Sequence, residues 1–243
     1  NSVAIGRLAL YAQDPASAAD MNNVAVGYLS GTAATTATAS TLIGSQAGSA
    51  LTSGINNTAV GAFSLNADTL GKFSVAVGNG ALERQNFTSS TNVYNTAVGY
   101  DAGSRITTGV NNTFLGGLAG DANTTGDDSV ALGYQALGAN TTGGANIAIG
   151  SGALDANTTA IHNVGVGTNA LGGNTTGTAN VALGHRALLT NTTASNNTAV
   201  GYDALKLNTI GFNNTAVGSL CLDAMVSGDY NVAMGTLALT TDA

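Results

Sequence analysis

The hexapeptide NNTAVG occurs at Asn196–Gly201 and again at Asn213–Gly218, and its last residue marks a repeat that runs through the whole chain. Close variants of this pattern end in a glycine in 14 copies, and we call these residues the anchor glycines. They are Gly6, Gly27, Gly44, Gly61, Gly78, Gly99, Gly116, Gly133, Gly150, Gly167, Gly184, Gly201, Gly218 and Gly235. Eleven of the 13 spacings are 17 residues, and the other two, at 6–27 and 78–99, are 21. So strict a period is typical of a solenoid in which each copy forms one coil.

The residues directly before each anchor glycine predict a short strand. The residue three positions before the glycine is β-branched in every copy, and the residue directly before it is aliphatic or Met. Between them stands Ala in 11 copies, with Leu42, Phe114 and Gly165 as the exceptions. This period of two is typical of a strand with one buried face, and β-branched residues favour strands. We therefore expect the β-branched and aliphatic side chains to point into the coil and the Ala side chains to point outward.

The rest of the repeat predicts a second packed segment and a polar loop. Three positions after the anchor glycine the residue is Ala, Ser or Cys, and four positions after it the residue is Leu in ten copies and Gly in four. We expect this segment to pack back on the strand, and we expect the Asn columns to form hydrogen-bonded ladders between coils. In five successive copies the loop carries NTT, beginning at Asn123, Asn140, Asn157, Asn174 and Asn191.

A unit of 17 residues cannot bury its own apolar stripe, but it can do so when it is stacked on its neighbours through parallel strands about 4.8 Å apart. The sequence therefore predicts an all-β fold, a parallel β-roll or β-helix solenoid of 14 coils. It forms a single domain, 1–243, with longer coils at 6–27 and 78–99. A helical solenoid is disfavoured because the apolar spacing is two rather than 3.6, and because Gly and Asn recur throughout.

An outward row of Ala side chains would form a flat apolar strip along the solenoid. Such a strip suits close side-by-side packing with another copy of the chain. The alternative is that Ala is only tolerated on a narrow roll. The predicted packing stripe consists of Ala4, Ala25, Ala59, Ala76, Ala97, Ala131, Ala148, Ala182, Ala199, Ala216 and Ala233.

Several copies resemble known fibre repeats. NSVAIG at Asn1–Gly6, followed by the small residue Ala9, resembles the head repeat of trimeric autotransporter adhesins. NTAVGYDAG at Asn95–Gly103 and NTAVGYDAL at Asn197–Leu205 are similar to repeats of bacteriophage tail-fibre proteins. The resemblance implies a left-handed parallel β-roll with three chains side by side. Neck, coiled-coil stalk and membrane-anchor motifs are not seen, and we expect the chain to be a fragment of a longer fibre.

The charges argue against nucleic acid and membrane as partners. The net charge is −7, and the six basic residues are scattered along the sequence, so no basic patch is expected to neutralise phosphates. No apolar run reaches the 18 or more residues that would indicate a transmembrane helix. We therefore expect this segment neither to bind nucleic acid nor to insert into a membrane.

The residues that usually carry catalysis or bind metals form no constellation. The 13 carboxylates are scattered without a pair that repeats in phase, and His162 and His185 occupy different positions of the repeat. Metal sites need converging ligands, and no phosphate-binding glycine motif is present. We therefore expect no enzyme activity, no cofactor and no metal. Cys221 stands in a column of small residues, which indicates a buried small side chain.

The two longer coils carry the candidate contact loops, because insertions in a solenoid fall in loops that often serve binding. We expect the four extra residues of each coil to lie around residues 14–20 and 85–92. The candidate contact residues are Asp14, Pro15, Gln85, Asn86 and Phe87.

Two functions remain open. The first is a non-enzymatic structural and adhesive segment of a trimeric surface fibre, either a phage or virus tail fibre or a bacterial adhesin head. It would be extracellular, on a virion or bacterial cell surface, and its repeated loops would contact a cell-surface glycan or protein receptor. The second is a monomeric solenoid that binds an extended ligand such as a glycan or ice. Adjacent Thr residues point apart on a strand, which disfavours an ice-binding face.

Overall fold

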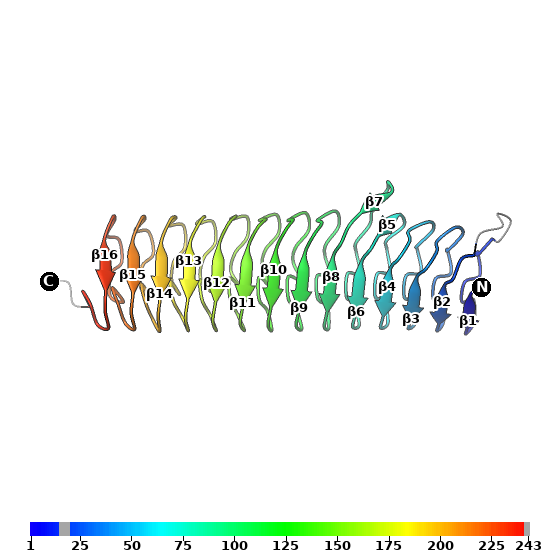
Figure 1. The fold of residues 1–243 in the computed structure, drawn as a ribbon, viewed down its shortest axis with the longest axis horizontal. Helices are drawn as coiled ribbons and strands as arrows, with labels where there is room; N and C mark the ends of the chain where they lie inside the picture. The colour runs from blue at the N-terminus through cyan, green and yellow to red at the C-terminus, as the bar shows by residue number, and fades with distance from the viewer. Residues whose placement is uncertain (15–19, 241–243) are drawn as a thin grey trace. The chain divides into compact units, whose positions relative to one another are not determined.

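The computed structural model describes residues 1–14 and 20–240. The chain divides into two compact units, Asn1–Thr125 and Gly126–Ala243, which we call the N-terminal and the C-terminal unit and describe one at a time. The described residues form short strands and no helix. The predicted all-β solenoid is confirmed, because in each unit successive coils are joined through parallel strands (Figure 1).

In the N-terminal unit, one strand precedes each anchor glycine. The pairing confirms the two longer coils, because Val3 pairs with Val24 and Val75 with Thr96, 21 residues apart, whereas Val24 pairs with Thr41. These strands are β1 (Val3–Ile5), β2 (Val24–Val26), β3 (Thr41–Ile43), β4 (Thr58–Val60), β6 (Val75–Val77), β8 (Thr96–Val98) and β9 (Thr113–Leu115). A separate parallel pair, β5 (Gly71–Lys72) and β7 (Thr91–Asn92), forms at the second longer coil.

The C-terminal unit repeats the same coil without insertion. Its strands pair in parallel with a constant offset of one repeat, as in Val130 with Ile147 and Ile147 with Val164. They are β10 (Val130–Leu132), β11 (Ile147–Ile149), β12 (Val164–Val166), β13 (Val181–Leu183), β14 (Thr198–Val200), β15 (Thr215–Val217) and β16 (Val232–Met234).

The anchor glycines allow the coils to stack closely. Gly150 has a φ of 128°, a backbone conformation that favours glycine, and a Cβ added there would lie 2.6 Å from the carbonyl carbon of Gly167 in the next coil. Backbone atoms cannot yield to such a contact, so any side chain at this position would push two coils apart.

The position four residues after the anchor glycine, which we call the leucine column, supplies the large side chains of the core. Leu137 and Leu154 are fully buried there, although their φ values of 57° and 52° are left-handed. That conformation costs a non-glycine residue about 1–2 kcal/mol, while burying a Leu side chain gains about 1.5–3 kcal/mol. Burial of the side chain therefore outweighs the backbone strain.

An Asn column four residues before the anchor glycine forms the predicted ladder. The backbone N–H of Asn163 donates to Oδ1 of Asn146 at 3.0 Å, and Nδ2 of Asn163 donates to the carbonyl oxygen of Gly177 at 2.8 Å. The backbone N–H of Asn180 in turn donates to Oδ1 of Asn163 at 2.9 Å. Each side chain thus joins two neighbouring coils through groups that would otherwise be buried without partners.

A second Asn ladder lies ten residues before the anchor glycine in the C-terminal unit, and we call this position the variable column. Nδ2 of Asn157 donates to Oδ1 of Asn140 at 2.9 Å, and Nδ2 of Asn174 donates to Oδ1 of Asn157 at 3.1 Å. The Asn side chains of the predicted NTT loops are therefore interior groups, and only the following residues reach the surface.

Candidate functional site

The predicted alanine packing stripe lies inside the coils. The side chains of Ala25, Ala59, Ala76, Ala97, Ala131, Ala148, Ala182, Ala199 and Ala216 are fully buried, and Ala233 is 5% exposed. Ala4, in β1, is exposed. The prediction that this column points outward is wrong. The reason is that the leucine column fills the interior opposite the strand, so that only a methyl group fits between.

The two large exceptions in the alanine column, Leu42 and Phe114, support this arrangement of the interior. A Cβ added at Gly103 or Gly120, in the leucine column, would lie 2.8 or 2.7 Å from the ring of Phe114. Leu42 occupies the corresponding space beside Gly31 and Gly48. Large residues therefore enter the alanine column only where the leucine column has lost its side chains.

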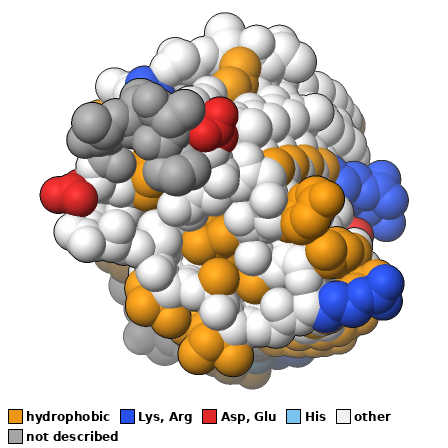
Figure 2. All heavy atoms as spheres, turned by 90° about the vertical axis from the view of Figure 1, so that its right-hand side faces the viewer, with side chains coloured by type: hydrophobic (Ala, Val, Ile, Leu, Met, Phe, Trp, Pro, Cys, Tyr) orange, Lys and Arg blue, Asp and Glu red, His pale blue; other side chains and the backbone are white. Residues whose placement is uncertain are grey.

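The residues on either side of the alanine column form the outward face of the strands, which we call the outer strand face. It consists of the β-branched and the aliphatic positions of every strand from β1 to β4, of β6 and from β8 to β16, and none of these residues is buried. Leu115 is 43% exposed, Leu132 42% and Leu183 38%. Figure 2 shows that hydrophobic side chains reach the surface at the end that carries the N-terminus. Each unit therefore presents rows of apolar side chains to solvent.

Only part of the predicted contact loop at the second longer coil faces solvent. Gln85 is fully buried and Phe87 is 7% exposed, whereas Asn86 is exposed. The prediction of Gln85 and Phe87 as contact residues is wrong, because their side chains hold the loop from inside. β7 and the segment beside it stand out from the neighbouring coils (Figure 1).

The other predicted loop is described only in part. Asp14 is exposed, and Pro15 lies outside the described residues.

A buried carboxylate anchors the loop at the second longer coil. Asp68 accepts a hydrogen bond from Nε2 of Gln85 at 2.7 Å, and its Oδ1 accepts from the backbone N–H groups of Gly71 at 3.1 Å and Phe87 at 3.2 Å. Oε1 of Gln85 accepts from Nδ2 of Asn95 at 2.9 Å. Burial raises the pKa of Asp68 above its usual 3.8, although the hydrogen bonds that it accepts from Gln85, Phe87 and Gly71 lower it. The loop is thus fixed at its two buried residues, Gln85 and Phe87.

The C-terminal unit contains a closed cluster of charges around Asp203. This carboxylate is bound by Arg186 at 2.7 Å and by Lys206 at 3.4 Å. The hydrogen bond to Asp203 raises the pKa of Arg186 further. The ring of His185 stacks on Tyr202, with centroids 5.4 Å apart. Because the two cations share one carboxylate, this cluster has a structural role rather than open binding capacity.

The exposed tyrosines do not form a continuous platform. Tyr28, Tyr100, Tyr134 and Tyr202 follow their anchor glycines and are about half exposed, but they lie on coils that are not consecutive. A glycan-binding strip of stacked rings is therefore not built at this position.

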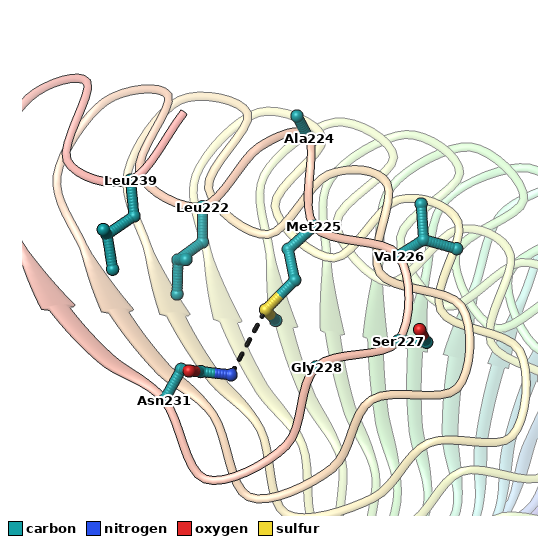
Figure 3. Close-up of a pocket in the computed structure, with 8 residues that line it drawn as sticks. All are labelled: Leu222, Ala224, Met225, Val226, Ser227, Gly228, Asn231 and Leu239. Atoms are coloured by element: carbon teal, nitrogen blue, oxygen red, sulfur yellow. Dashed lines mark hydrogen bonds between the residues drawn. The ribbon is translucent and has the colours of Figure 1, made fainter. Parts of the chain in front are cut away.

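A pocket of about 500 Å³ lies in the coil that carries β16, between Leu222, Met225, Val226 and Leu239 (Figure 3). Nδ2 of Asn231 lies 3.5 Å from the sulfur of Met225, which occupies the variable column. The lining residues carry no charge, and Ser227 and Asn231 are the polar side chains among them.

Elsewhere in the part of the chain that the structure describes, no three His, Cys, Asp or Glu side chains converge as metal ligands would. These residues also contain no helix of the length and apolarity that a membrane span requires. Cys221 is fully buried, as predicted, and burial raises the pKa of its thiol.

No family model, curated protein or solved structure matches this chain. The resemblance to adhesin and tail-fibre repeats therefore stays a prediction that rests on the motifs themselves.

Sequence reasoning missed the outer strand face and two exposed arginines, Arg84 and Arg105, that occupy the same repeat position. The sequence contains a pattern that could have indicated each of these two features. Leu42 and Phe114 occur only beside glycines of the leucine column, which indicates that the alanine and leucine columns share one interior. The arginines both stand six residues after an anchor glycine, in consecutive copies.

Proposed function

We propose that this chain is a non-enzymatic structural and adhesive segment of an extracellular surface fibre, on a virion or a bacterial cell, in which three copies pack side by side. The observation that carries the proposal is the outer strand face. It takes the place of the alanine stripe as the surface through which the copies associate.

The composition of the outer strand face supports another copy of the chain as its partner. Its positions hold only Val, Thr, Ile, Leu and Met in all 14 strands, with no charged residue. Burying such a face removes apolar area from water without leaving a charge unpaired, which is the property of an obligate interface. Since every coil presents the same two columns, one copy can meet another along the length of each unit in a single register.

The number three and the adhesive role come from the resemblance to adhesin and tail-fibre repeats. In such an assembly each exposed loop is present three times, so weak contacts with a cell surface are strengthened by multivalency.

The alternative of an ice-binding monomer is disfavoured by the Thr hydroxyls. In the NTT loops the first Thr of each pair donates to the next coil, as Thr158 does to the carbonyl oxygen of Thr175 at 3.1 Å and Thr175 to that of Thr192 at 3.0 Å. Only the second Thr of each pair, such as Thr159, remains exposed. A face that binds ice needs hydroxyl groups spaced in two directions to match the ice lattice, and one Thr per coil provides them in one direction only.

The native mass, measured by light scattering, tests the proposal. We expect three times 23.7 kDa for the unaltered chain. Replacing Ile149, Val166 and Leu183 by Gln should give a folded protein of 23.7 kDa, because polar amides would lose hydrogen bonds in the contact. The matched control replaces Thr142, Thr159 and Thr176, all exposed on the loops, by Gln and should stay trimeric. A monomeric unaltered chain, or an outer-face variant of unchanged mass, would contradict the proposal.

A further inference from the structure

Two exposed arginines lie on consecutive coils at the second longer coil. The backbone N–H of Arg84 donates to the carbonyl oxygen of Ser104 at 3.1 Å, directly before Arg105. Both side chains are exposed. Parallel strands place neighbouring coils about 4.8 Å apart, so two positive charges of the same column are held close together. Without a partner, like charges at this spacing repel each other.

Among the described residues, no ion pair joins either guanidinium to a carboxylate within 4.0 Å, although Glu83 directly precedes Arg84 in the sequence. The C-terminal unit differs, because there Arg186 and Lys206 share Asp203. The arginines of the N-terminal unit therefore keep their full capacity to bind an external anion.

Neutral hydrogen-bond donors surround the two arginines. Along the loop, Arg84, Asn86 and Thr88 are exposed in alternation with the buried Gln85 and Phe87. Oδ1 of Asn86 accepts from the hydroxyl of Thr69 at 3.1 Å, and no hydrogen bond of its side-chain Nδ2 is found among the described residues. Each exposed side chain of this segment thus carries at least one N–H or O–H donor.

Thr108 brings a further hydroxyl to the same surface. The backbone N–H of Asn86 donates to the carbonyl oxygen of Thr107 at 3.0 Å, which places the exposed Thr108 on the coil next to the loop. The loop itself is held by Asp68 through Gln85 and Phe87. Because the loop that carries Asn86 and Thr88 is held before a ligand arrives, binding does not have to order this loop, and this lowers the entropic cost.

We propose that Arg84, Arg105, Asn86, Thr88 and Thr108 bind the carboxylate or sulfate groups of an acidic polysaccharide. Planar guanidinium groups bind such oxyanions through two parallel hydrogen bonds, and the amide and the hydroxyls match the hydroxyl oxygens of sugars. Nucleic acid fits less well, because it offers at most one hydroxyl per nucleotide to the exposed Asn86, Thr88 and Thr108, whereas an acidic polysaccharide carries several hydroxyl groups beside each charge. The inference rests on the proposed adhesive function, since it names the partner of the loop.

The test uses the whole chain and three labelled polymers, read by fluorescence anisotropy. Alginate carries carboxylates, heparin carries sulfates and dextran is uncharged. The double variant Arg84→Gln/Arg105→Gln removes both guanidinium groups, and the matched control Arg7→Gln/Lys206→Gln removes the same net charge from other coils. We expect the double variant to bind the acidic polymers at least about tenfold more weakly, and the control to bind within about twofold of the unaltered chain.

Each result has a separate meaning. Binding of alginate alone or heparin alone supports the proposal and decides between carboxylate and sulfate. Equal binding of dextran, equal losses in the two variants, or no binding of either acidic polymer overturns it. The native mass is measured independently, so a trimer that binds neither acidic polymer refutes this inference while the proposed assembly stands.

Discussion

Ten residues before each anchor glycine, the two units fill the variable column differently. In the C-terminal unit this column is an Asn ladder through Asn140, Asn157, Asn174, Asn191 and Asn208, closed by side-chain hydrogen bonds from coil to coil. In the coils of 17 residues, the N-terminal unit holds Ala34, Leu51, Asp68 and Ile106 in this column before Asn123, and all five are buried.

The difference shows which parts of the coil are essential and which can be exchanged. Both units keep the strand register, the anchor glycines and the ladder four residues before them. The variable column can be apolar or polar, because either choice leaves no buried group without a partner. The unit without a continuous Asn ladder here is the one that accommodates the inserted loop, since Asp68 and Gln85 can bind both the coil and the insertion.

The largest loss of stability should come from the core of the N-terminal unit, where Phe114 takes the place of Ala in the alanine column. Phe114→Ala removes a fully buried ring, and the flanking Gly103 and Gly120 offer no side chains to fill the space. We expect the free energy of unfolding in urea to fall by about 3–5 kcal/mol.

A rescue variant separates this volume effect from other causes. Adding Gly103→Leu and Gly120→Leu to Phe114→Ala recreates the arrangement of Ala148 between Leu137 and Leu154 in the C-terminal unit. Most of the lost stability should return. If the triple variant is no more stable than Phe114→Ala, the two columns do not share one space.

A smaller loss of stability is expected when an Asn of the variable column in the C-terminal unit is replaced by Leu, the residue type that Leu51 provides in the N-terminal unit. In Asn174→Leu, Oδ1 of Asn157 loses its donor, the carbonyl oxygen of Gly177 keeps only the donor Nδ2 of Asn163, and Nδ2 of Asn191 loses one acceptor. Despite the gain in apolar burial, we expect a loss of about 2–3 kcal/mol. Hydrogen exchange should show faster opening of amides in the C-terminal unit. An unchanged protection pattern would mean that the two kinds of column are interchangeable one residue at a time.

The smallest effect should be the pH dependence that Asp68 gives to the N-terminal unit. Because burial raises its folded-state pKa above the usual 3.8, the contribution of Asp68 is most favourable below pH 3.8 and declines as the pH rises through the folded pKa. Relative to Asp68→Asn, the unaltered chain should lose at most about 1.4 kcal/mol per pH unit in that window. Asp155, whose pKa burial also raises, is present in both proteins and cancels. A pH-independent difference in unfolding free energy would show that the hydrogen bonds offset burial.

Much of the fold was predictable because it follows from the period. The anchor glycines gave the positions of the strands, the parallel register and the two longer coils. The Asn columns indicated ladders, since stacked identical amides can bond to each other. The period did not predict which side of the strand faces the interior, because a strand such as Val181–Leu183 is apolar on both sides. The sequence signal for it was limited to Leu42 and Phe114, which stand beside glycines of the leucine column.

The 17-residue period by itself determined that successive copies stack as parallel coils, because only stacking buries so short a unit. The alternation of the strand residues left open which face of the strand is inside, and the tertiary structure decided it. The left-handed backbone after each anchor glycine directs a Leu such as Leu171 across the narrow coil, and the remaining space admits Ala but not Val. The larger apolar side chains of the strands therefore lie at the surface because the space inside the coil is too small for them, although they are hydrophobic.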